Sequence, residues 1–214
     1  MGIPFSYRRL PSCHYKEVCR LKRLLFSLFL VAVLILPGAF CQAAPAIDGY
    51  QQLKWGTPEN AVRAFAAASG WIADSVEESH GTRLLFYEGS YEGHKSIIAC
   101  KLYNGKFYEL GVVYAGQQHS ALADWQAITA LLTQRYGPPH RRFYTFDPPY
   151  HDGDGYEDEA VRLGKGRVMA VWMDADKNTV LCELTPALLI KVVYQDEIIS
   201  GIVDEAAGKR QAKQ

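Results

Sequence analysis

Residues 96–114 decide the fold. They read S-I-I-A-C-K-L-Y, then Asn104-Gly105, then K-F-Y-E-L-G-V-V-Y. Asn-Gly between two strand-like runs is the strongest short-range signal for a β-hairpin, because a type I′ turn needs a positive φ at both central residues. A two-residue turn predicts these cross-strand pairs: Tyr103 with Lys106, Leu102 with Phe107, Cys100 with Glu109, and Ile98 with Gly111.

The predicted hairpin is apolar on both faces. One face carries Ile98, Cys100, Leu102, Phe107 and Val113; the other carries Ile97, Ala99, Tyr103, Tyr108, Leu110 and Val112. Strands that are apolar on both sides belong in a sheet that is covered on both faces or that has a partner on one.

Two helices are predicted from their end signals. The first begins near Thr57, which we expect to be the N-cap before Pro58, and ends at Ser69-Gly70. The second follows Ser120 as N-cap and ends at Gly137, since two prolines come next. Its apolar residues recur at helical spacing, at Leu122, Trp125, Ile128, Leu132 and Tyr136.

The remaining pattern predicts strands at 83–89, 141–146, 167–173, 179–184 and 188–194, and a closing helix at 196–207. We therefore expect one α+β domain over residues 47–207, followed by a polar tail at 208–214. Its sheet is expected to be mainly antiparallel, with the helices packed on one face. The order of elements suggests two α-β-β-β halves.

The first 43 residues have the pattern of a secretory signal peptide. Six basic residues precede the apolar run 24–36, and Pro37-Gly38 and small residues follow. We expect cleavage after Ala43 or Ala46. The alternatives are an uncleaved anchor and a lipoprotein modified at Cys41, although Phe40 stands where a small residue is wanted. A start at Val18 or Leu21 would give a shorter signal.

The charge balance argues against nucleic acid as a partner. The chain has 23 basic and 23 acidic residues, of which six and one lie in residues 1–43. The rest therefore holds 17 basic and 22 acidic residues, a net charge of −5. Nucleic-acid binding needs a basic surface, and a polybasic membrane-surface role is equally unsupported. We expect a periplasmic or secreted protein with no stable membrane span once the signal is removed.

Two cysteines, Cys100 and Cys182, lie in strand-like runs of the expected domain. In an oxidising compartment they could form a disulfide that joins the two halves of the chain. The alternative is a pair of buried free thiols that act as small apolar side chains.

Three segments together resemble a group of small bacterial envelope proteins of uncharacterised function. They are W-G-T-P-E-N-A-V (55–62), L-Y-N-G-K-F-Y-E-L (102–110) and L-L-T-Q-R-Y-G-P-P (131–139). In that group a W-G-x-[S/T]-P-E helix precedes a hairpin and a helix that ends in Y-G-x-P, and a late strand carries a tryptophan, here Trp172. The chain is also distantly similar to the small α+β modules of outer-membrane assembly lipoproteins. The resemblance implies a location and a fold, and no activity.

The acidic loop D-P-P-Y-H-D-G-D-G-Y-E-D-E (147–159) is the candidate metal site. Asp152, Asp154 and Asp158 with two glycines suggest calcium, although the EF-hand spacing fails because Val161 stands where the bidentate Glu is needed. Adding His151 would suit a transition metal. The alternative is a solvated acidic loop. We expect no other cofactor.

No nucleophile, base and stabiliser can be combined into a catalytic site, so we expect a non-enzymatic protein. Glu109 could be a buried carboxylate, or it pairs with a Lys or Arg. The favoured hypothesis is a binding or adaptor module of the cell envelope, with an envelope protein as its partner and a tyrosine-rich surface. The candidate surface residues are Tyr103, Tyr108, Tyr144 and Tyr150, joined by Tyr91 and Tyr156. The alternative is a carrier of a lipid or another small apolar ligand.

Overall fold

A computed structural model of the protein describes residues 45–79, 81–116 and 120–211, with side chains described up to residue 206. The expected signal peptide lies outside these residues. The first half of the described chain contains β1 (Gly49–Tyr50), β2 (Leu53–Lys54), α2 (Glu59–Ala68), β3 (Ile72–Ser79), β4 (Thr82–Tyr91), β5 (His94–Tyr103) and β6 (Lys106–Ala115). The second half contains α3 (Ala121–Tyr136), β7 (Arg141–Phe146), α4 (Glu157–Arg162), β8 (Gly166–Met173), β9 (Thr179–Leu184), β10 (Leu189–Gln195) and α5 (Glu197–Gln211).

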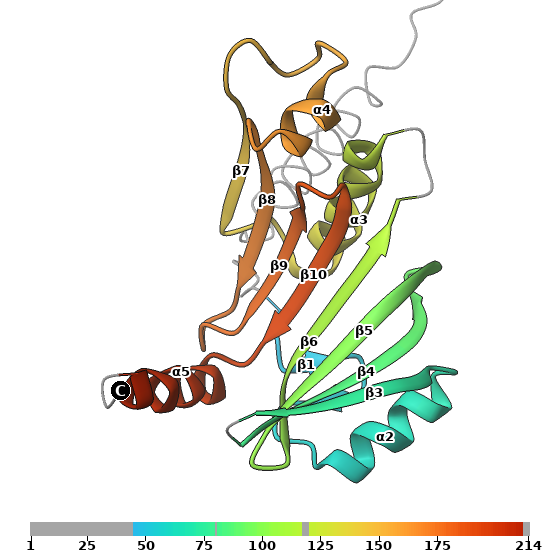
Figure 1. The fold of residues 1–214 in the computed structure, drawn as a ribbon, viewed down its shortest axis with the longest axis vertical. Coiled ribbons are helices and arrows are strands. Elements are labelled where there is room, and N and C mark those ends of the chain that lie inside the picture. Colours follow the sequence, from blue (N-terminus) through green and yellow to red (C-terminus); the bar gives the residue numbers. More distant parts are fainter. Residues whose placement is uncertain (1–44, 80, 117–119, 212–214) are drawn as a thin grey trace, which may run out of the picture. The chain divides into compact units, whose positions relative to one another are not determined.

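Eight of these strands form one antiparallel sheet in the order β3-β4-β5-β6-β10-β9-β8-β7 (Figure 1). The sheet consists of two meanders, β3 to β6 and β7 to β10, and each meander follows one long helix, α2 or α3. The last strands of the two meanders, β6 and β10, pair with each other and join the halves. The α+β class and the mainly antiparallel sheet are therefore confirmed. The first half has four strands and not three, because residues 72–79 add β3, and the second half has the four strands predicted for it.

The predicted hairpin is β5–β6, and its turn residues have positive φ, 49° at Asn104 and 74° at Gly105. The two pairs nearest the turn are as predicted, but the register then shifts by one. Cys100 lies opposite Leu110 and Ala99 lies opposite Gly111, so the expected pairs with Glu109 and with Ile98 are wrong. The cause is a β-bulge, in which an extra residue of β6, Tyr108, stands between the partners of Leu102 and Lys101.

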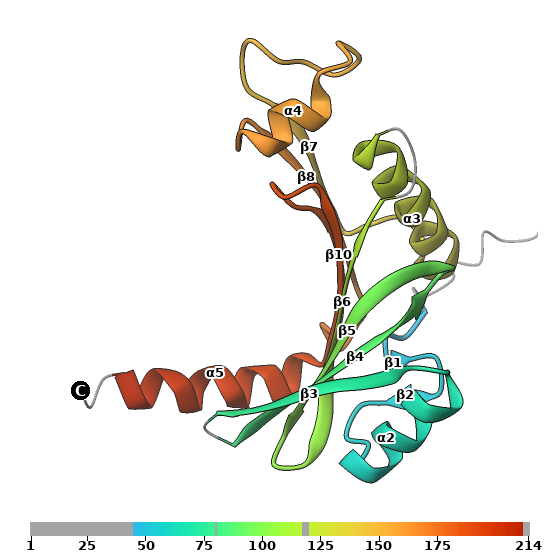
Figure 2. The ribbon, with the colours of Figure 1, turned by 45° about the vertical axis from the view of Figure 1, so that its right-hand side comes forward.

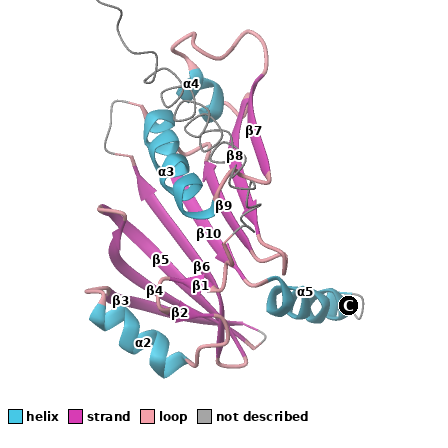
Figure 3. Ribbon diagram, turned by 180° about the vertical axis from the view of Figure 1, so that it is seen from behind, coloured by secondary structure: helices cyan, strands magenta, loops and turns pink. Residues whose placement is uncertain are grey.

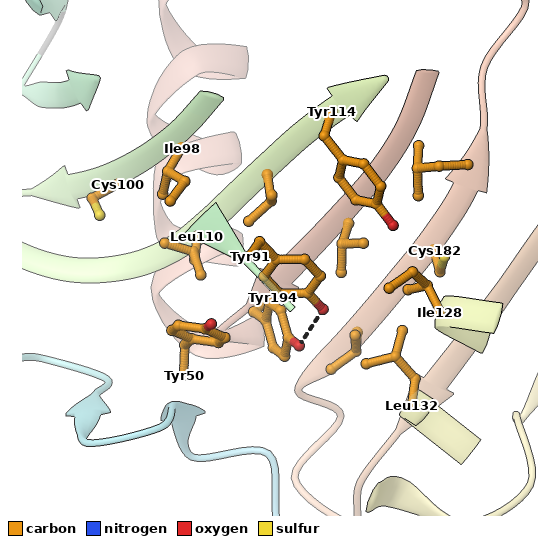
Figure 4. Close-up of a cluster of buried hydrophobic side chains, with 14 of the residues drawn as sticks. Tyr50, Tyr91, Ile98, Cys100, Leu110, Tyr114, Ile128, Leu132, Cys182 and Tyr194 are labelled. Carbon is orange, nitrogen blue, oxygen red and sulfur yellow. Dashed lines mark hydrogen bonds between the residues drawn. The ribbon is translucent and has the colours of Figure 1, made fainter. Parts of the chain in front are cut away.

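One face of the sheet is covered by α2, α3 and the short β1–β2 ribbon (Figure 2). Figure 3 shows α3 lying across β9 and β10. Beneath these elements the core includes Tyr50, Tyr91, Ile98, Leu110, Tyr114, Ile128, Leu132 and Tyr194 (Figure 4). The hydroxyls of Tyr91 and Tyr194, from opposite halves of the chain, lie 2.9 Å apart and form a buried hydrogen bond. Aromatic packing therefore links the two meanders below the helices.

Because of the bulge, the two faces of the hairpin carry different residues from those predicted. Leu110 and Val112 are fully buried on the helix-covered face with Ile98, Cys100, Leu102 and Phe107. Ile97 and Val113 lie on the opposite face, and Ile97 is 59% exposed. One face of the hairpin is therefore buried and the other is open. Helix α5 leaves the sheet on the open side (Figure 2).

The helix ends follow the sequence signals closely. The Ser120 hydroxyl accepts a hydrogen bond from the Ala123 N–H, and Gly137, with a φ of 79°, ends α3. In α2 the N-cap is Pro58, one residue later than expected, because the Thr57 hydroxyl donates to the Lys54 carbonyl instead of capping.

We predict that Gly105→Ala lowers the free energy of unfolding by about 1 kcal/mol, since an L-residue is strained at positive φ. No atom lies within 4 Å of the position that the new Cβ would take, so the cost comes from the backbone alone. Gly111→Ala in the same hairpin is the matched control, because its Cβ would meet Ala99 only at ordinary contact distance. Urea unfolding of both variants measures the difference, and equal losses would contradict the turn assignment.

Candidate functional site

The sheet face opposite α2 and α3 carries a continuous row of apolar residues. Cross-strand pairing aligns one residue from each of six neighbouring strands, and all six are half-buried. We call these residues the apolar row: Val171, Leu181, Val193, Gly111, Ala99 and Phe86. Among the residues that the structure describes, no helix or strand covers this row, and a contiguous apolar surface that is left uncovered is a candidate binding surface.

Residues at the neighbouring positions along the strands, on either side of the apolar row, add further apolar side chains and two ion pairs. Ile97, Val113, Phe143 and Met169 extend the apolar surface towards one end of the strands. Glu183 pairs with Lys191 at 3.9 Å on that side, and Glu109 pairs with Lys101 at 2.7 Å on the other. We call the apolar row, these four residues and the two ion pairs the open face. The two ion pairs balance their own charges, and Arg167 lies over the Phe143 ring, 4.0 Å from its centroid, at the β7–β8 edge. The centre of the open face is therefore apolar, with a basic side chain at that edge.

A hollow of about 530 Å³ adjoins the open face where α5 leaves the sheet. We call it the α5 hollow; residues from β4, β5, β6 and α5 line it, among them Leu84, Lys101, Tyr108, Glu109, Ser200 and Asp204. The bulge in β6 allows Tyr108 and its neighbour Glu109 to line it together.

The first turn of α5 is firmly attached beside the α5 hollow. The carbonyl of Tyr108 accepts the N–H of Asp196 at 2.9 Å, and the Asp196 carboxylate caps the helix by accepting the N–H of Ile199 at 2.7 Å. The bulged strand thus supplies both the floor of the hollow and the anchor of the helix that walls it. Burial, with a smaller effect of Glu109, raises the pKa of Tyr108 to about 12, so its hydroxyl is protonated at neutral pH.

Glu109 is not an isolated buried carboxylate. It faces Lys101 across the strands and not Cys100, and its Oε1 lies 2.7 Å from the Lys101 Nζ. Of the two roles that the sequence left open, the structure shows the ion pair.

The candidate surface tyrosines do not form one surface. Tyr103 is half-buried beside the hairpin turn, and Tyr108 is buried in the α5 hollow. Tyr144 lies on the helix-covered face, where its ring stacks on Trp125 with 6.2 Å between centroids. Tyr150 belongs to the loop after β7, and Tyr91 is in the core.

Sequence reasoning missed the apolar row, because the pairing of β6 with β10 has no local signal.

The three aspartates of the acidic loop serve separate hydrogen bonds. Asp158 accepts the N–H groups of Ala121 and Leu122, both at 2.9 Å, at the start of α3. Asp154 accepts the N–H groups of His151 and Tyr156, and these hydrogen bonds lower its pKa. Asp152 accepts the Tyr144 hydroxyl at 3.0 Å. Within the described ranges no three His, Cys, Asp or Glu side chains are grouped to hold a metal ion. In this structure the three carboxylates therefore hydrogen-bond within the loop and to the start of α3, and the calcium site stays a prediction.

Of the two alternatives for the cysteines, the structure shows free thiols and no disulfide. Cys100 on β5 and Cys182 on β9 are buried free thiols. Two strands, β6 and β10, lie between them, so their backbones are at least about 14 Å apart, whereas a disulfide needs Cα atoms within about 7 Å. The alternative expectation, two thiols that pack as small apolar side chains, describes them.

Comparison with protein-family models, with curated proteins and with solved structures gives no match to this chain. Of the helices in the described part of the chain, none is both long enough and apolar enough to cross a membrane. Function is therefore inferred from the open face and the α5 hollow themselves.

Both thiols are predicted to resist alkylation in the folded protein. Burial raises the pKa of Cys100 and of Cys182 to about 12, so neither forms much thiolate at pH 8. Iodoacetamide should add no mass to the native protein, and should add to both cysteines in urea without a reductant. Labelling in urea that appears only after reduction would show that the two cysteines are paired.

Asp158→Ala should destabilise the protein by about 1–2 kcal/mol, because it leaves two N–H groups of α3 without an acceptor. Asp152→Ala, a matched change in the same loop, should cost less than about 0.5 kcal/mol. Thermal unfolding of both variants measures the loss of stability, and repeating it with calcium chloride tests for metal binding. A rise in Tm with calcium that either substitution abolishes would support a calcium site in the loop.

Proposed function

We propose that the protein is a secreted or periplasmic, non-enzymatic binding module of the bacterial cell envelope that holds a partner protein on its open face. The observation that supports this proposal is the apolar row, which crosses six strands and has no covering element among the described residues. The opposite face of the same strands is fully packed.

The partner is expected to present an apolar strip with a few polar groups at its edges. The apolar row consists of aliphatic side chains, one glycine and the aromatic ring of Phe86. The Glu–Lys pairs on either side are already satisfied, so they tolerate burial better than single charges would. An apolar centre with a polar rim is the usual composition of a protein–protein interface. Together with the signal-peptide pattern and the mildly acidic composition, this supports an envelope protein as the partner.

The alternative function, a carrier of a lipid or another small apolar ligand, has less support. A carrier takes its ligand into an apolar cavity. Large buried side chains such as Trp125, Tyr91 and Tyr194 occupy the space between the sheet and the helices. The α5 hollow and a second hollow of about 680 Å³ at the acidic loop both include charged lining residues, such as Lys101 and Asp154.

The proposal predicts position-specific crosslinking in cells. A photo-crosslinking amino acid at Val113 or Val171 on the open face should give one discrete product of the same partner. The same amino acid at Gln126 or Gln134, exposed on α3 on the other side of the sheet, should give none. Val193→Asp places a charge in the middle of the apolar row and should abolish the product from Val171.

Mass spectrometry of the crosslinked product identifies the partner, and circular dichroism of Val193→Asp controls for folding. Equal products from the α3 positions, or no product from either open-face position, would contradict the proposal.

A further inference from the structure

We propose that the α5 hollow binds a basic side chain, Lys or Arg, that the partner projects from the segment lying on the apolar row. This inference rests on the proposed function, and it names the chemistry of the partner at one defined place. Three features of the hollow carry it: its position beside the apolar row, its charge, and the kinds of side chain that line it.

The hollow begins at the next same-face position beyond the apolar row, two residues further along the same strands. Leu84 lies two residues before Phe86 on β4, Lys101 lies two residues after Ala99 on β5, and Glu109 lies two residues before Gly111 on β6. Two residues of a strand span about 7 Å. A partner segment on the apolar row can therefore place its next side chain in the hollow without leaving the surface of the sheet.

The charge of the hollow suits a cation. Among the described residues that line it, Lys101 is the one basic side chain, and it is already paired with Glu109 at 2.7 Å. Asp204, on the α5 wall, forms no ion pair with another described residue. The lining thus has a net charge of −1, and Glu77, opposite Leu84 on β3, adds a second acid near the rim. An anion in this position would meet the carboxylates of Asp204 and Glu77, with which no described basic side chain pairs.

The lining also matches the two parts of a long basic side chain. Leu84 and Val203 offer apolar surface to a methylene stem, and such stems pack along apolar surface while the charged head reaches polar groups. The hydroxyls of Thr82, Tyr108 and Ser200 offer acceptors for the N–H groups of the head beside the Asp204 carboxylate. A volume of about 530 Å³ is ample for one such side chain with some water.

The first test uses small probes on the processed, ¹⁵N-labelled protein. n-Butylguanidinium chloride should give saturable amide shifts at Lys101, Glu109, Ser200 and Asp204, whereas sodium pentanoate at the same ionic strength should give none. Asp204→Asn should weaken n-butylguanidinium binding about fivefold, as expected for loss of one partly exposed ion pair. Asp176→Asn, the same change at an exposed turn, should leave it unchanged.

The second test separates this inference from the proposed function. In cells, Asp204→Lys should strongly reduce the crosslinked product formed from Val171, and Asp176→Lys should not. If the product from Val171 persists undiminished in Asp204→Lys, the assignment to the partner is overturned while the open face remains the binding surface. Binding of n-butylguanidinium together with that result would identify the hollow as a site for free organic cations. Absence of shifts with either probe would overturn the cation site itself.

Discussion

The antiparallel pairing of β6 with β10 is the interaction on which the rest of the structure depends. Its seven residue pairs, from Leu189 opposite Ala115 to Gln195 opposite Glu109, turn two separate meanders into one sheet. Alternate residues of these strands point to opposite faces of the sheet: Val112 and Tyr194 belong to the core, whereas Gly111 and Val193 belong to the apolar row. A slip of one residue would exchange the two faces, so the register fixes the core and the open face together.

The bulge at Tyr108 is the second constraint, because it changes how β6 ends. Without the extra residue, Tyr108 and Glu109 would point to opposite faces, and the α5 hollow would lose one of its lining side chains. The carbonyl of Tyr108 also accepts the N–H of Asp196, which starts α5 beside the sheet. One inserted residue therefore accounts for the anchor of α5 and for the floor of the hollow. Bulges are common beside functional sites for this reason.

The sequence predicted what local signals specify. Asn104-Gly105 gave the hairpin turn, and Ser120 and Gly137 gave the ends of α3, because each depends on a few neighbouring residues. The bulge, the strand order and the separation of the two cysteines depend on long-range pairing, so they could not be predicted. The edge strand β3 was missed because I-A-D-S-V-E-E-S is exposed along its whole length and so lacks an alternating apolar pattern. The sequence showed a hairpin that is apolar on both sides, but the apolar row itself was missed, because it depends on the register of β8, β9 and β10.

The most direct test of the account is methionine oxidation in intact cells compared with the purified protein. Outside the expected signal peptide the chain has two methionines, Met169 and Met173, and both project from β8 on the side of the apolar row. If a partner covers this face, mild peroxide should oxidise them more slowly in the envelope than in the purified protein. Hydroxyl-radical labelling of Tyr156, which is 64% exposed on the acidic loop, should have the same rate in both. If each methionine is oxidised at the same rate in cells as in the purified protein, the claim that a partner binds on the open face would be contradicted.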